Sequence, residues 1–80
     1  MKATIIKANH TRSLYIFERE DSEIGYLEVL DLVDLETEEE LAGGFQDIGN
    51  QIAVRLSTNE RLKICIEDFC SLEVAEKMID

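Results

Sequence analysis

The chain has 80 residues, of which 45% are hydrophobic; 18 Asp and Glu stand against 8 Lys and Arg, giving a formal net charge of −10. One small domain over residues 1–80 is expected, because the chain is too short for two cores and too apolar to be disordered throughout. The negative charge repels phosphate and anionic lipid, so nucleic acid is a disfavoured partner and no membrane association is expected.

Two strands are predicted at the start of the chain. The segment Lys2–Ala8 has β-branched residues in its middle and ends in a polar turn. The segment Ser13–Arg19 follows, and its alternate residues are apolar on both faces, which predicts a strand covered on both sides. A polar turn at residues 20–23 joins it to the next segment as a hairpin.

A longer strand and a short helix are predicted next. The segment Ile24–Leu35 fits a helical period almost as well as a strand period, and we predict a strand that bends or bulges. Thr37 and Glu40 then match a capping box, which predicts a short helix between the third and fourth strands. Gly43 and Gly44 end that helix within about two turns.

An antiparallel hairpin and a terminal helix complete the pattern. Apolar and polar residues alternate on both sides of a turn at residues 58–60, which predicts a hairpin with one face toward the core. The residues expected on that inner face are Ile52, Val54, Leu56, Leu62, Ile64 and Ile66. Ser71 is suited to cap a C-terminal helix at about 71–79.

These elements predict a mainly β fold, a small five-stranded antiparallel barrel with a helix between strands three and four and a helix at the C-terminus. This is the element order of an OB-fold, and an SH3-like barrel explains the pattern nearly as well. The turn before the fourth strand contains Gly and Asp and reads Phe45-Gln46-Asp47-Ile48-Gly49-Asn50. In this turn the chain resembles small uncharacterised bacterial barrel proteins.

The acidic residues are concentrated in the middle of the chain. Between Glu20 and Val54 there are eleven carboxylates and no Lys or Arg. Such a block attracts basic partners, so we expect a non-enzymatic binding or regulatory module that meets a basic protein surface. The residues expected to form this acidic face are Glu36, Glu38, Glu39, Glu40 and Asp47. A homodimer is an alternative, because a core this small gains from association.

A second hypothesis follows from the OB-like order, in which single-stranded nucleic acid lies across the second and third strands. The residues available for stacking and phosphate contact are Arg12, Tyr15, Phe17, Tyr26 and Arg61. Aromatic residues in so small a domain are more often core, and carboxylates border this platform, so the hypothesis is disfavoured.

Neither catalysis nor a metal site is expected. His10 is the only histidine, no nucleophile motif accompanies it, and Cys65 and Cys70 add too few ligands for zinc. The run from Asp31 to Glu36 lacks the glycine of an EF-hand loop, and a solvated acidic face explains it better. We expect no cofactor, reduced thiols and a cytoplasmic location, since no signal-peptide or transmembrane run is present.

Overall fold

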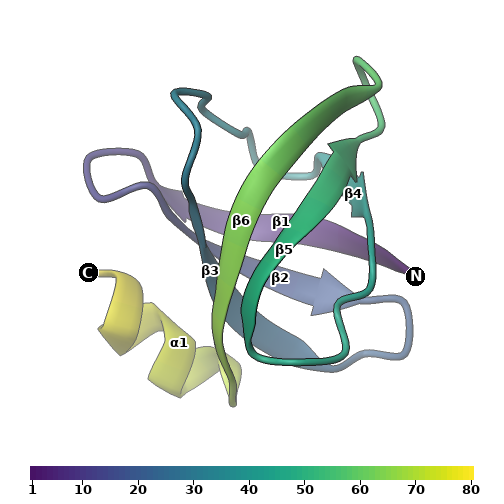
Figure 1. The fold of residues 1–80 in the computed structure, drawn as a ribbon. Coiled ribbons are helices and arrows are strands. Elements are labelled where there is room, and N and C mark those ends of the chain that lie inside the picture. The colour runs from purple at the N-terminus through teal and green to yellow at the C-terminus, as the bar shows by residue number, and fades with distance from the viewer.

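The chain forms a mainly β structure that closes into a small antiparallel barrel, described over residues 1–80 by a computed structural model. Six strands precede one helix (Figure 1). Their bounds are β1 Lys2–Asn9, β2 Leu14–Arg19, β3 Ile24–Val29, β4 Glu40–Ala42, β5 Gly49–Arg55, β6 Glu60–Phe69 and α1 Leu72–Ile79. No helix is long and apolar enough to cross a membrane.

The barrel is built from two three-stranded meanders joined along both edges. The strand order is β1-β2-β3-β6-β5-β4, and every neighbouring pair is antiparallel. Pairing of β3 with β6 joins the meanders on one side, and pairing of β1 with the three-residue β4 joins them on the other. The closing strand β4 covers only Lys2–Thr4 of β1 and Val54–Arg55 of β5.

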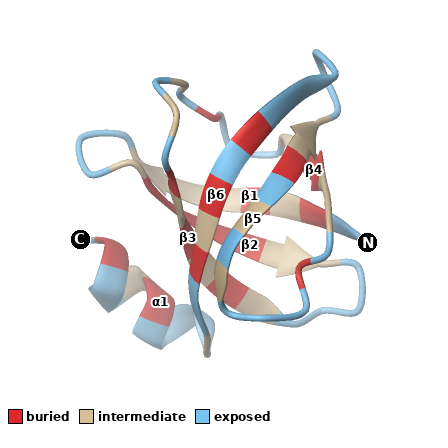
Figure 2. Ribbon diagram, in the orientation of Figure 1, coloured by how far each residue is buried: buried red, intermediate tan, exposed pale blue.

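Two apolar clusters hold the fold together. A cluster of 13 buried residues fills the barrel interior, and a cluster of four lies between α1 and the outer face of β2 (Figure 2). Tyr15 and Phe17 point into the barrel, while Leu14 and Ile16 point outward beneath α1. The prediction that this strand is covered on both faces is confirmed.

The predicted helix between the third and fourth strands is wrong, and a sixth strand stands in its place. Glu38 has a φ of 73°, which is incompatible with a right-handed helix. The backbone amide of Glu38 donates to the carbonyl of Ile5 at 2.6 Å, and the amide of Ile5 donates to the carbonyl of Glu39 at 2.9 Å. These bonds lead the chain into β4, so the barrel has six strands where five were predicted.

The third strand is also shorter than predicted, ending at Val29 instead of Leu35. Residues 30–39, which we call the acidic loop, follow it. The amide of Lys63 donates to the Asp31 carboxylate at 2.8 Å, and the amide of Leu30 donates to the Lys63 carbonyl at 2.9 Å. The Asp31 side chain thus accepts the hydrogen bond from β6 that a backbone carbonyl of a longer β3 would accept.

The predicted inner face of β5 is wrong as well, whereas that of β6 is confirmed. Leu62, Ile64 and Ile66 are buried, but Ile52 is 44% exposed and Ala53 is fully buried. Ala53 pairs with Leu62, and residues paired across two strands share a face. The large interior residues of the other strands fill the barrel, so β5 contributes a small inward residue.

The C-terminal helix is confirmed. The Ser71 side chain accepts a hydrogen bond from the Val74 amide at 3.2 Å, as an N-cap does. Ala75 and Ile79 are buried against the outer face of β2. The Asn9 side-chain amide donates to the Ile79 carbonyl at 2.6 Å, which fastens the end of α1 to the barrel.

Candidate functional site

The fold divides the predicted acidic face between the two ends of the barrel. The acidic loop lies at the end that also carries the β1–β2 and β5–β6 turns, and His10 Nε2 lies 2.8 Å from the Leu35 carbonyl oxygen. Asp47 lies in the β4–β5 loop at the opposite end (Figure 1). There Arg19 Nη1 donates to the Phe45 carbonyl at 2.8 Å. Asp47 is thus separated from the other predicted acidic residues.

A shallow groove of about 430 Å³ gathers three of the predicted acidic residues. Its lining residues are Thr37, Glu38, Glu39, Glu40, Leu56 and Ser57. We call it the acidic groove. Leu56 is 36% exposed and is its only apolar residue. The groove thus combines carboxylates with one aliphatic surface.

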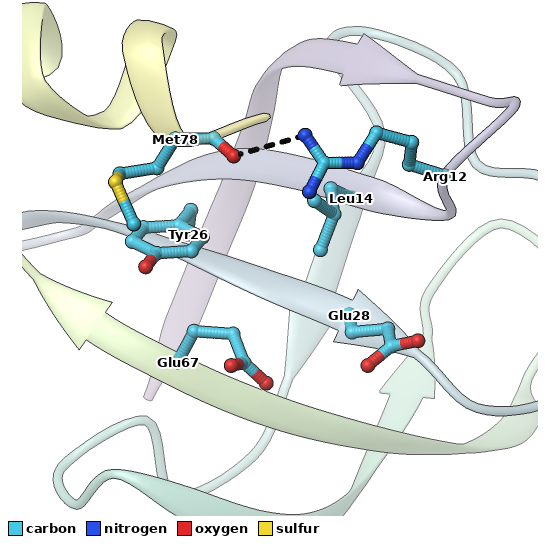
Figure 3. Close-up of a pocket in the computed structure, with 6 residues that line it drawn as sticks. All are labelled: Arg12, Leu14, Tyr26, Glu28, Glu67 and Met78. Atoms are coloured by element: carbon cyan, nitrogen blue, oxygen red, sulfur yellow. Dashed lines mark hydrogen bonds between the residues drawn. The ribbon is translucent and has the colours of Figure 1, made fainter. Parts of the chain in front are cut away.

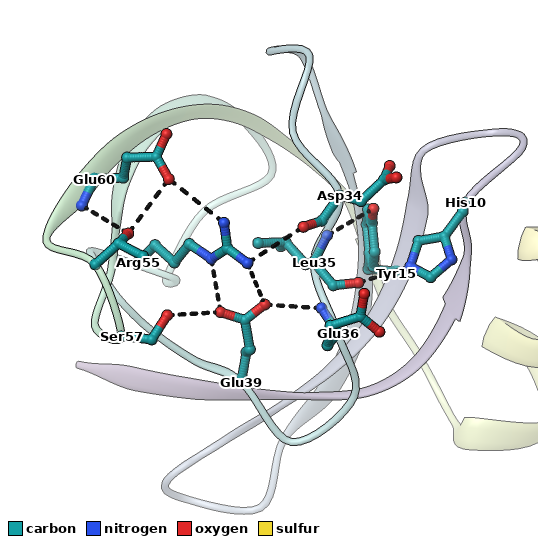
Figure 4. Close-up of polar contacts among 10 residues, drawn as sticks. His10, Tyr15, Asp34, Leu35, Glu36, Glu39, Arg55, Ser57 and Glu60 are labelled. Atoms are coloured by element: carbon teal, nitrogen blue, oxygen red, sulfur yellow. Dashed lines mark hydrogen bonds and ion pairs between the residues drawn. The ribbon is translucent and has the colours of Figure 1, made fainter.

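Glu39 is committed to the structure of this groove. Its carboxylate accepts from Arg55 Nε at 2.7 Å and from Arg55 Nη2 at 2.8 Å (Figure 4). It also accepts from Ser57 Oγ at 2.9 Å and from the Glu36 amide at 2.8 Å. The hydrogen bonds from Arg55 are the main reason that the pKa of Glu39 falls from 4.5 to about 2.

Three other carboxylates near the groove are free. Glu36, Glu38 and Glu40 are exposed, and their carboxylates make no ion pair or hydrogen bond. Arg55 is already shared between Glu39 and Glu60, the latter at 3.4 Å. The negative charge of Glu38 and Glu40 is therefore left uncompensated at the rim of the groove.

Sequence reasoning missed Arg55, Leu56 and Ser57 as parts of this site. Arg55 is the first base after the acidic run, and that position was the available signal that it would be drawn to a carboxylate. Which carboxylate it meets depends on β4 pairing with β5, and Leu41 opposes Arg55 in that pairing. That pairing was not predicted, because residues 37–42 were assigned to a helix.

The five residues of the nucleic-acid hypothesis do not form one surface. Tyr15 and Phe17 are fully buried, so neither offers a ring to a base. The Tyr15 hydroxyl accepts from the Leu35 amide at 3.1 Å and supports the acidic loop. Arg12 and Tyr26 line a second pocket, whereas Arg61 is exposed at the start of β6.

The two cysteines belong to neither predicted surface. Cys65 and Cys70 are free. Interaction with Glu67 raises the pKa of Cys65, and burial raises that of Cys70, so both thiols are held in the protonated form. No group of His, Cys, Asp and Glu side chains is arranged to hold a metal ion.

Fold and groove together define a small closed β-barrel with a helix against one side and free carboxylates at one end. No protein-family model, curated protein or solved structure matches the chain. The resemblance of the turn at residues 45–50 to small bacterial barrel proteins therefore stays a prediction.

Proposed function

We propose that this protein is a non-enzymatic binding or regulatory module that takes a basic segment of a partner protein into the acidic groove. The observation that carries the proposal is the pair of free carboxylates, Glu38 and Glu40, beside the partly exposed Leu56. A Lys or Arg side chain has an aliphatic stem and a cationic head. The stem would lie on Leu56 while the head meets the carboxylates.

The internal charges of the groove support this assignment. Arg55 cannot compete for Glu38 or Glu40, because its guanidinium is held by Glu39 and Glu60. Charges of this exposed kind mainly speed association and select partners, and salt weakens them. Affinity would then depend on how well the apolar stem covers Leu56.

The rigidity of the acidic loop also supports binding there. Its backbone is held by the Tyr15 hydroxyl at Leu35 and by the Asp31 carboxylate at Lys63. A surface that is ordered before the partner arrives loses less conformational entropy on binding. Within the groove itself, Glu39 is held by Arg55.

A titration with a synthetic peptide of alternating lysine and leucine tests the proposal. We expect binding at low salt, weaker binding at physiological salt, and shifts of the Leu56 methyl resonances. The double variant Glu38→Lys, Glu40→Lys should weaken binding at least tenfold. The matched control is Glu23→Lys with Asp47→Lys, which makes the same charge change at the other end of the barrel.

Equal weakening by the two double variants would overturn the proposal, because it would mean that only the net charge matters. Binding that leaves the Leu56 resonances unmoved would overturn it too. A pull-down from lysate at both salt concentrations, repeated with both double variants, then asks which basic protein depends on the groove.

The arrangement of strands and aromatic residues also bears on whether the barrel is OB-like or SH3-like. An OB-type platform needs exposed aromatic residues on the second and third strands, and the burial of Tyr15 and Phe17 removes two of its three. No helix separates β3 from β4. We therefore favour the SH3-like comparison over the OB-like one and propose no nucleic-acid function.

A further inference from the structure

A second pocket opens away from the acidic groove, where the C-terminal end of α1 meets the outer faces of β2, β3 and β6 (Figure 3). Its volume is about 480 Å³. The residues that line it are Arg12, Leu14, Tyr26, Glu28, Glu67 and Met78. We call it the Arg12 pocket. It holds both signs of charge, which the acidic groove does not.

Arg12 forms the positive side of the pocket. Its Nη1 donates to the carbonyl of Met78 at 3.3 Å and to the carbonyl of Asp80. The Nε and Nη2 groups have no acceptor within the chain, and no Asp or Glu side chain pairs with the guanidinium. Anchored at the negative end of a helix, the guanidinium keeps donors for a further anion.

Glu28 and Glu67 form the negative side. They come from adjacent strands, β3 and β6, and Figure 3 shows both carboxylates across the pocket from Arg12. Neither carboxylate takes part in an ion pair. The pKa of Tyr26 is raised, first by burial and then by the charges of Asp68 and Glu67, as expected beside uncompensated carboxylates.

Apolar surface lies between the two sides. Tyr26 is half-buried, Leu14 is 9% exposed and Met78 is 48% exposed. The Tyr26 hydroxyl has no hydrogen-bond partner within the chain, and its ring faces the pocket beside the Met78 side chain (Figure 3). A ligand with a short aliphatic chain would therefore find contact between the opposite charges.

We propose that the Arg12 pocket binds a free basic amino acid, with the ligand carboxylate on Arg12 and its two amines on Glu28 and Glu67. A simple amine would be repelled by Arg12, and a simple carboxylate by the two glutamates. A basic amino acid matches one positive and two negative groups. Its aliphatic chain packs on Leu14 and Tyr26.

The same chemistry occurs in free lysine and in a peptide that ends in lysine, so the experiment separates these sources. Wild-type protein is titrated with L-lysine and with the peptide Gly-Gly-Lys, following the resonances of Leu14, Tyr26 and Met78. Tighter binding of free lysine identifies a pocket for the small molecule. Tighter binding of Gly-Gly-Lys would overturn the small-molecule proposal and assign the pocket to a peptide terminus.

Ligand analogues test each charge. Lysinamide lacks the carboxylate and norleucine lacks the second amine, and we expect each to bind at least tenfold more weakly than lysine. Lysine and lysinamide of equal affinity would overturn the role of Arg12. Lysine without any effect on the three pocket resonances would overturn the site.

Protein variants complete the test. Glu28→Gln and Glu67→Gln should weaken lysine binding at least tenfold, and neither change breaks an ion pair of the fold. Arg12→Gln should weaken lysine binding and strengthen lysinamide binding, because it removes both the partner of the carboxylate and the positive charge that repels an amine. Because Arg12 also holds α1, the two glutamate variants decide the outcome if Arg12→Gln does not fold. Sensitivity to Glu38→Lys instead would move the ligand to the acidic groove and overturn the proposal.

Discussion

Arg55 and Glu39 form a two-bond ion pair that fastens the acidic loop to the end of β5. The Nε–Oε1 distance is 2.7 Å and the Nη2–Oε2 distance is 2.8 Å. Their side chains are 18% and 13% exposed, so water screens the pair less than it screens a surface pair. Glu39 lies between the free carboxylates of Glu38 and Glu40. The ion pair therefore holds the backbone that carries both of them, and so shapes the groove as well as stabilising it.

Stability should therefore depend on pH through Glu39. The pKa of Glu39 is depressed from 4.5 to about 2, so its contribution is complete above about pH 4.5 and is lost as pH falls toward 2. Glu39→Gln should lower the free energy of unfolding by about 2 kcal/mol at pH 7, with the difference from wild type shrinking in acid. Urea unfolding across this pH range measures it. Glu38→Gln, which removes an unpaired carboxylate, should cost almost nothing.

Gly25 should not tolerate a side chain. A Cβ atom there would lie 2.5 Å from the Asp68 carbonyl oxygen and 2.8 Å from Phe17 Cζ, both closer than van der Waals contact allows. Gly25→Ala should destabilise the barrel by about 2 kcal/mol or more, because a backbone atom cannot yield cheaply. At Gly44 the nearest atom would be 3.5 Å away. Thermal melts should show Gly44→Ala close to wild type, and equal effects would contradict the packing at Gly25.

The Tyr15 hydroxyl should matter to the acidic loop. It accepts from the Leu35 amide at 3.1 Å, and Leu35 is fully buried. Tyr15→Phe leaves that amide without a partner, which should cost about 1–2 kcal/mol. Hydrogen exchange at the Leu35 amide should then become faster. Tyr26→Phe removes a hydroxyl that has no partner, so unchanged exchange in Tyr15→Phe and faster exchange in Tyr26→Phe would contradict this assignment.

Local patterns in the sequence predicted the elements that depend on local residues. Ser71 predicted the start of α1, and the alternation of Leu62, Ile64 and Ile66 predicted β6, because a cap and a strand face are both set by neighbours in the chain. The capping-box pattern of Thr37 and Glu40 failed for the opposite reason. Backbone bonds with Ile5, far away in the chain, hold that segment in a turn that leads into β4.

The sequence predicted that the site is acidic, but not which of its carboxylates are bonded. The acidic residues of the loop were identified, yet the sequence does not distinguish Glu39, which is bonded, from Glu38, which is free. That distinction depends on the pairing of β4 with β5, which brings Arg55 to the loop. Asp47 was grouped with them by its charge, and the strand directions separate it. Long-range pairing, unlike charge, has no local signature here.

The inner face of β5 offers the sharpest test of the fold. Ala53 is fully buried opposite Leu62, whereas Ile52 is 44% exposed opposite Lys63. Ala53→Leu would force three extra carbons into a filled barrel and should cost about 2–3 kcal/mol. Ile52→Thr should change the free energy of unfolding by less than about 1 kcal/mol, because the side chain is already half in water.

Urea unfolding of both variants beside Ile64→Ala sets the scale, since truncation of that fully buried residue should cost about 3 kcal/mol. A large loss in Ile52→Thr with a tolerated Ala53→Leu would reverse the register of β5, because one residue of slip exchanges its two faces. Such a reversal would also turn Arg55 away from Glu39, since inward and outward residues alternate along the strand. The stability of these two β5 variants therefore tests the geometry on which the acidic groove depends.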